Sequence, residues 1–131
     1  MRTCFLAAVG VFILVGLSTG LASAAVRLKV DVPFAFVVNG VEHPAGSYEV
    51  REAGPDLTIL EVEKAGGGKA TATEILTRIA DVGLAEPEVV FDQAGGKSYL
   101  SEVLLPKADG LLVAGAPGKH THQRVKAAPA Q

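Results

Sequence analysis

The chain has 131 residues, of which 49% are apolar and 20% are charged, and its net charge is −2 with neutral histidines. This length suits a single domain. The slightly acidic balance lacks the basic surplus that binding to a phosphate backbone requires, so we expect no nucleic-acid partner.

The first 24 residues have the order of a secretory signal peptide. Arg2 is followed by the apolar run Phe5–Leu17 and then by small residues that end in Ala-Ser-Ala at 22–24. A positive start, an apolar core and an A-x-A site are typical of a cleaved leader. We therefore expect export to the periplasm or the cell exterior, with no membrane attachment after cleavage. A retained anchor is the alternative, although the strongly apolar part is shorter than the roughly 20 residues that span a bilayer.

Cleavage would remove both Arg2 and Cys4, the single cysteine of the chain. Loss of one positive charge changes the net charge from −2 to −3. The exported part would then contain no disulfide, no thiol nucleophile and no thiolate metal site. Its hydrophobic core alone must hold the fold, which is unusual for a small exported domain.

From residue 25 to residue 126, short apolar runs separated by glycine, proline and asparagine predict an all-β domain. Between Val26 and Val32 apolar and charged residues alternate, which places the apolar side chains on one face of a strand. Asn39-Gly40 is a two-residue hairpin signal. The further predicted strands are 34–38, 41–43, 47–51, 57–64, 88–92, 97–105, 111–114 and 120–126. We expect a single antiparallel β-barrel or β-sandwich of roughly eight short strands.

Three details of this domain are less regular. Residues 69–81 fit either a strand or a helix by periodicity, and their threonine content favours the strand. Tyr48 follows a Pro-Ala-Gly turn, and we expect it to be architectural, with its hydroxyl bonded to the backbone. Residues 127–131 are expected to form a disordered tail.

His120 and His122 form the sharpest candidate site. Residues i and i+2 of a strand point to the same face, so both imidazoles can reach one metal ion. Zinc or copper needs at least one more ligand. His43 is the only other histidine, and Asp109 or a glutamate is the alternative third ligand. Against a metal, the motif lies in a basic segment near the chain end, where histidines are commonly only solvated.

Other motifs are weaker. Gly95-Gly96-Lys97-Ser98 resembles the end of a phosphate-binding loop, but a strand follows it where such a loop requires a helix. No serine lies in a G-x-S-x-G elbow. Glu61 and Glu63 share one strand face and are most simply solvated outer residues. We therefore expect no catalytic residues and no enzyme.

Residues 32–40 (VPFAFVVNG) and 44–50 (PAGSYEV) together resemble a family of small exported bacterial proteins of unknown function. Its members share a V-P-F-x-F-x-V-x-G pattern followed by P-A-G-x-Y-x-V, and Tyr99–Val103 is similar to the second hairpin of that family. The resemblance implies a compact β-domain and an exported location. It implies no catalytic residues.

Three functional hypotheses follow. The first is a non-catalytic exported binding or structural module, whose partner is an unknown protein, an envelope polymer or a small apolar ligand. The second is a metal-binding protein that uses His120 and His122, with His43 as a further ligand. The third is an extracellular hydrolase. We expect no cofactor apart from the zinc or copper of the second hypothesis.

Overall fold

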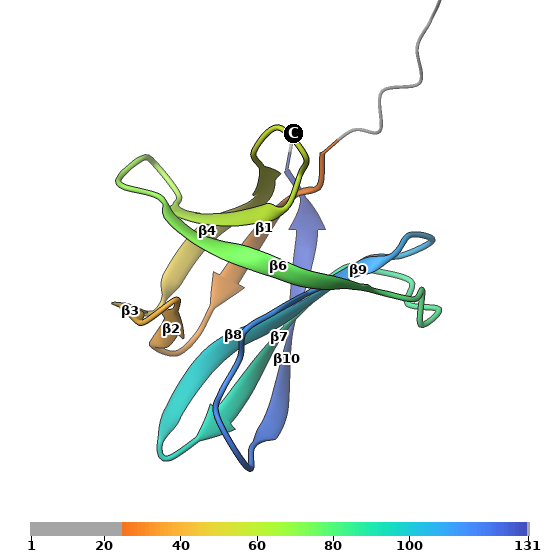
Figure 1. The fold of residues 1–131 in the computed structure, drawn as a ribbon. Helices are drawn as coiled ribbons and strands as arrows, with labels where there is room; N and C mark the ends of the chain where they lie inside the picture. Colours follow the sequence, from red (N-terminus) through yellow and green to blue (C-terminus); the bar gives the residue numbers. More distant parts are fainter. Residues whose placement is uncertain (1–24, 131) are drawn as a thin grey trace, which may run out of the picture.

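A computed structural model describes residues 25–130, so the expected signal peptide lies outside the described residues. Among these residues no helix is long and apolar enough to span a membrane. The described part of the chain forms ten strands (Figure 1). They are β1 (Arg27–Val32), β2 (Phe36–Val38), β3 (Val41–His43), β4 (Gly46–Ala53), β5 (Ile59–Lys64), β6 (Thr71–Ile79), β7 (Glu88–Ala94), β8 (Lys97–Leu104), β9 (Gly110–Val113) and β10 (Thr121–Pro129).

Eight of these strands close into an antiparallel barrel, so the barrel alternative is confirmed over the sandwich. The order around the barrel is β8-β7-β10-β1-β4-β5-β6-β9, and β9 returns to β8. The β2–β3 hairpin lies outside this ring and joins β8 through a short parallel pairing at Val37 and Tyr99. Closure removes most of the free sheet edges that would otherwise pair with other chains.

Side chains fill the interior of the barrel, as is usual for eight strands. The alternation expected in β1 is confirmed, because Leu28, Val30 and Val32 are buried while the residues between them are exposed. The fully buried side chains come from six strands; those with the largest volume are Tyr48, Phe91, Leu60, Leu100 and Leu111. Burial of such side chains is the main stabilising contribution in a chain without disulfides.

The hairpin signals of the sequence are confirmed. Asn39 and Gly40 have φ angles of 46° and 77°, and they connect β2 to β3. Gly95 and Gly96, with φ angles of 57° and 77°, connect β7 to β8. Two successive positive φ angles are the signature of the turn type that matches the twist of paired strands. The phosphate-loop lookalike is therefore a hairpin turn.

Two further expectations about local structure are resolved. The ambiguous segment 69–81 is a strand, because Thr71–Ile79 pairs with β5 on one edge and β9 on the other. Tyr48 donates a hydrogen bond from its hydroxyl to the carbonyl of Pro44 at 2.6 Å, as expected, and burial raises its pKa.

The expected tail at 127–131 is partly wrong. Ala127, Ala128 and Pro129 belong to β10 and pair with Val30, Lys29 and Leu28 of β1. This pairing joins the two ends of the domain and closes the barrel, so these residues are held by non-local contacts that a local pattern does not reveal.

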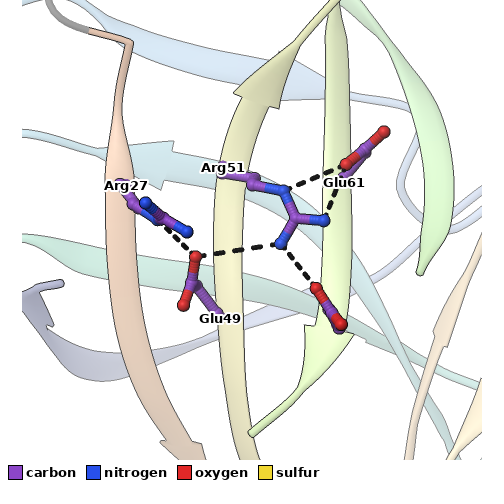
Figure 2. Close-up of polar contacts among 5 residues, drawn as sticks. Arg27, Glu49, Arg51 and Glu61 are labelled. Atoms are coloured by element: carbon purple, nitrogen blue, oxygen red, sulfur yellow. Dashed lines mark hydrogen bonds and ion pairs between the residues drawn. The ribbon is translucent and has the colours of Figure 1, made fainter. Parts of the chain in front are cut away.

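An ion-pair network covers the outer face of β1, β4 and β5 (Figure 2). Arg51 lies between the carboxylates of Glu61 and Glu63, at N–O distances of 2.9 and 2.8 Å. Glu49 bridges Arg51 to Arg27. The hydrogen bond to Glu63 raises the pKa of Arg51. Glu61 and Glu63 are thus outer-face residues paired with arginine, and this arrangement gives no support to a pair of catalytic acids.

Candidate functional site

The β7–β10 ladder brings Asp92 and His122 together. They are directly opposite each other in the register of the two antiparallel strands, so their side chains share a face. His120 precedes His122 by two residues and lies on the same side. The ligand atoms of Asp92, His120 and His122 all lie within 4.8 Å of one another. The expectation that the two histidines converge is therefore met, and Asp92 is the third member of the cluster.

Asp92 is buried on the outer side of the barrel wall. Strand alternation puts Asp92 on the face opposite to the core residue Phe91, and the connection between β9 and β10 (residues 114–120) crosses over it. Only 3% of Asp92 is exposed. One carboxylate oxygen, Oδ2, accepts a hydrogen bond from the backbone N–H of Ala116 at 3.1 Å.

The other carboxylate oxygen, Oδ1, has no hydrogen-bond partner in the described part of the chain. Its nearest polar neighbours are His122 Nδ1 at 2.9 Å and His120 Nε2 at 3.5 Å. The His122 distance is short enough for a hydrogen bond, but the ring is not oriented to make one. A buried carboxylate oxygen without a donor is costly, and this one faces two imidazole nitrogens.

The backbone sets the tautomer of His120. Its Nδ1 is 2.8 Å from the carbonyl oxygen of Gly118, and a carbonyl only accepts hydrogen bonds, so Nδ1 carries the proton. In the neutral ring Nε2, which lies 3.5 Å from Asp92 Oδ1, then carries a lone pair. A lone pair facing a carboxylate is repulsive until a cation or a second proton lies between them. A carbonyl bonded to the far nitrogen is the usual support of a metal-binding histidine.

The two separations between Asp92 Oδ1 and the imidazole nitrogens also suit a common metal ligand set. Tetrahedral coordination with bonds of about 2.0–2.1 Å puts ligand atoms about 3.3 Å apart. The two distances to Oδ1, 2.9 and 3.5 Å, bracket this value. His122 remains largely exposed, with 54% of its side chain accessible, so the cluster is open to solvent. Three protein ligands would leave the remaining position of a tetrahedral ion to water.

His43 does not belong to this cluster. It lies in β3 opposite Phe36, and its ring stacks on the Phe36 ring with centroids 5.2 Å apart. The Tyr48 ring meets it edge-on at 5.6 Å. The Nε2 atom of His43 is buried and has no hydrogen-bond partner among residues 25–130, and desolvation lowers the pKa of His43. The expectation that His43 serves as the third ligand therefore finds no support. Asp92, and not His43, lies beside His120 and His122.

This burial predicts a pH dependence of stability. In the unfolded chain His43 titrates near its ordinary pKa of 6.5, and in the fold its pKa is lower. Between these values the unfolded state binds more protons, so the free energy of unfolding rises with pH through this window. The stabilisation is complete above pH 6.5 and is lost as pH falls through the folded pKa. Urea unfolding at pH 7.5 and 5.5 measures it.

His43→Phe is the matched variant for this prediction, because it keeps a ring stacked on Phe36 and removes the titrating group. We expect it to lose less stability than the native protein on going from pH 7.5 to 5.5. An identical loss of stability in both proteins would contradict the assignment of this pH dependence to His43. It would indicate the other histidines instead.

Three serines, Ser47, Ser98 and Ser101, lie in the described part of the chain. The Ser47 hydroxyl donates to the carboxylate of Asp31, and Ser98 and Ser101 are buried in β8. No hydrogen bond joins a serine to His43 within residues 25–130. The hydrolase hypothesis therefore gains no support.

The fold and cluster define a small β-barrel with a two-histidine, one-aspartate group on its outer wall. Comparisons with protein-family models, curated proteins and solved structures gave no match.

Asp92 was missed by sequence reasoning, although one signal pointed to it. Val89, Val90 and Phe91 form a continuous apolar run, which is typical of a strand covered on both faces. An acidic residue that directly follows such a run is expected to be buried and to need a partner. Which partner it meets depends on the neighbouring strand, and the sequence pattern does not specify that neighbour.

Proposed function

We propose that this protein is an exported, non-catalytic β-barrel module that binds a zinc or copper ion through Asp92, His120 and His122. The observation that carries the proposal is the buried Oδ1 of Asp92, which has no hydrogen-bond partner in the described structure and lies within 3.5 Å of two imidazole nitrogens. A bound cation could contact the carboxylate and both imidazoles together.

The donor set supports zinc or copper over other metals. Imidazole nitrogen suits zinc and copper, whereas calcium and magnesium prefer sites made of oxygen alone. Asp92 Oδ2 is already fixed by the hydrogen bond that it accepts from Ala116 N–H, and His120 Nδ1 by the one that it donates to the Gly118 carbonyl. Such supporting contacts hold ligands in a fixed orientation and reduce the entropy lost on binding.

The position of the cluster supports binding rather than catalysis. It lies on the outer wall of the barrel. A hollow of about 560 Å³ lies elsewhere on the molecule, and its lining is formed by Lys29, Asp31, Ser47, Tyr48, Ala65 and residues 126–128. Side chains fill the interior of the barrel. The structure therefore gives no support to a small apolar ligand as the partner. Residues 1–24, which have the order of a signal peptide, support export. A module without cysteine does not depend on the redox state of the compartment that it enters.

Isothermal titration of the untagged protein with Zn²⁺ and with Cu²⁺ at pH 7.5 tests the proposal. We expect one ion per chain. His122→Ala and Asp92→Asn should each weaken binding at least tenfold, since each removes one ligand atom or its charge. His43→Phe should bind as the native protein does. At saturation of about 100 times Kd, the ion should raise the free energy of unfolding by about 2.7 kcal/mol.

Absence of stoichiometric binding would overturn the proposal, and so would equal affinities of His122→Ala and His43→Phe. Circular dichroism of each variant separates a lost site from a lost fold.

A further inference from the structure

Strand β10 changes partners along its length. From Thr121 to Lys126 it pairs with β7, and from Ala127 to Pro129 it pairs with β1. Strand β1 continues to Val32, but beyond Val30 it pairs only with β4. The two strands therefore diverge beyond the pairing of Val30 with Ala127, as Figure 1 shows. We call this opening, lined by Asp31, Val32 and residues 121–126, the β1–β10 wedge.

One edge of β10 has no partner strand in the wedge. Among the described residues, β7 is the only strand paired with residues 121–126, so the backbone groups on the other edge lack a ladder. Unpaired edges of this kind are templates for an added strand. Figure 1 shows β10 leaving β1 near the C-terminus and running beside β7 for the rest of its length.

Side-chain exposure agrees with an open edge. Gln123 is opposite the core residue Phe91, so it faces the inner side of the sheet, yet it is exposed. Thr121, which shares this face, is exposed as well. Phe34 packs edge-to-face on Phe91 at 5.1 Å and covers the core there. The wedge is thus open to solvent while the core behind it remains closed.

Two lysines lie where the wedge opens, on a protein that is acidic overall. Lys29 and Lys126 line the hollow at the point where β1 and β10 separate, and neither forms an ion pair within the described chain. Arg124 lies further along β10, 3.3 Å from Glu88. The one acid lining this hollow, Asp31, accepts the hydrogen bond of Ser47.

We propose that the β1–β10 wedge binds an extended acidic peptide segment, which adds a strand to the free edge of β10. Backbone hydrogen bonds would supply the attachment, and the lysines would select acidic side chains. The site is separate from the metal cluster, which uses the outer face of β10 rather than its edge.

Capped seven-residue peptides test the proposal against the purified protein in the presence of EDTA, so that a metal plays no part. A peptide of alternating valine and glutamate should bind, and one of alternating valine and lysine should bind at least tenfold more weakly. Lys126→Glu should weaken binding of the acidic peptide about tenfold. Lys107→Glu, an exposed loop variant at the β8–β9 turn, is the control and should leave binding unchanged.

Two readouts identify strand addition. N-methylation of alternate backbone nitrogens on one side of the acidic peptide should abolish binding, and on the other side it should not. Amide hydrogen exchange within residues 121–125 should slow at least tenfold at saturation. Equal binding of both N-methylated peptides, or of the lysine peptide, would overturn the proposal. Sedimentation showing dimers with the same protected amides would also overturn it, since a second copy would then occupy the edge.

Discussion

Leu60→Ala is expected to lower the free energy of unfolding by about 3–5 kcal/mol. Leu60 lies in β5 and is fully buried in the barrel, so its truncation leaves a cavity that the surrounding strands fill only in part. The described part of the chain contains no cysteine, so no disulfide offsets the loss. Because domains of this size are typically stable by about 5–15 kcal/mol, this variant should be close to unfolding in mild urea.

Leu76→Ala is the matched control, because it makes the same chemical change on the neighbouring strand β6. Leu76 is 56% exposed, so we expect a change of about 0.5 kcal/mol or less. Urea unfolding followed by circular dichroism gives both values. Similar losses in the two variants would mean that the interior of the barrel is not packed as described.

Gly115→Ala is expected to destabilise the fold by about 2–4 kcal/mol and to weaken metal binding at least tenfold. A Cβ atom at Gly115 would lie 2.0 Å from Asp92 Oδ2 and 3.0 Å from Ser101 Oγ. The 114–120 connection would have to move away, and the bond from Ala116 to Asp92 would be lost. Chemical unfolding and zinc titration measure the two effects.

Gly46→Ala is the control, since its added Cβ would meet only Tyr48 at an ordinary 3.7 Å. It should be tolerated. In an Asp92→Ala background, Gly115→Ala should cost less than in the native protein, because the main clash is gone. Additive losses in the double variant would contradict the contact between Gly115 and the carboxylate.

The strands of this protein follow from local chemistry that a sequence displays. Two-residue alternation in β1 and Asn39-Gly40 between β2 and β3 predicted the correct elements, because side-chain direction and turn geometry depend on adjacent residues. The same reasoning put His120 and His122 on one side of a strand. Threonine-rich residues 69–81 also formed the expected strand, because β-branched side chains fit a pleated surface.

The order of the strands depends on contacts between distant parts of the chain. Sequence alternation puts His120 and His122 on one side of β10, but only barrel closure places Asp92 of β7 opposite His122. His43 stacks on Phe36 because the local β2–β3 hairpin pairs these two residues. The same closure pairs Ala127–Pro129 with β1 and leaves the edge of residues 121–126 free. The sequence by itself thus determined the strands, the turns and the two converging histidines. The tertiary structure decided the third ligand and the open edge, because strand neighbours are chosen by the burial of the whole core rather than by any local pattern.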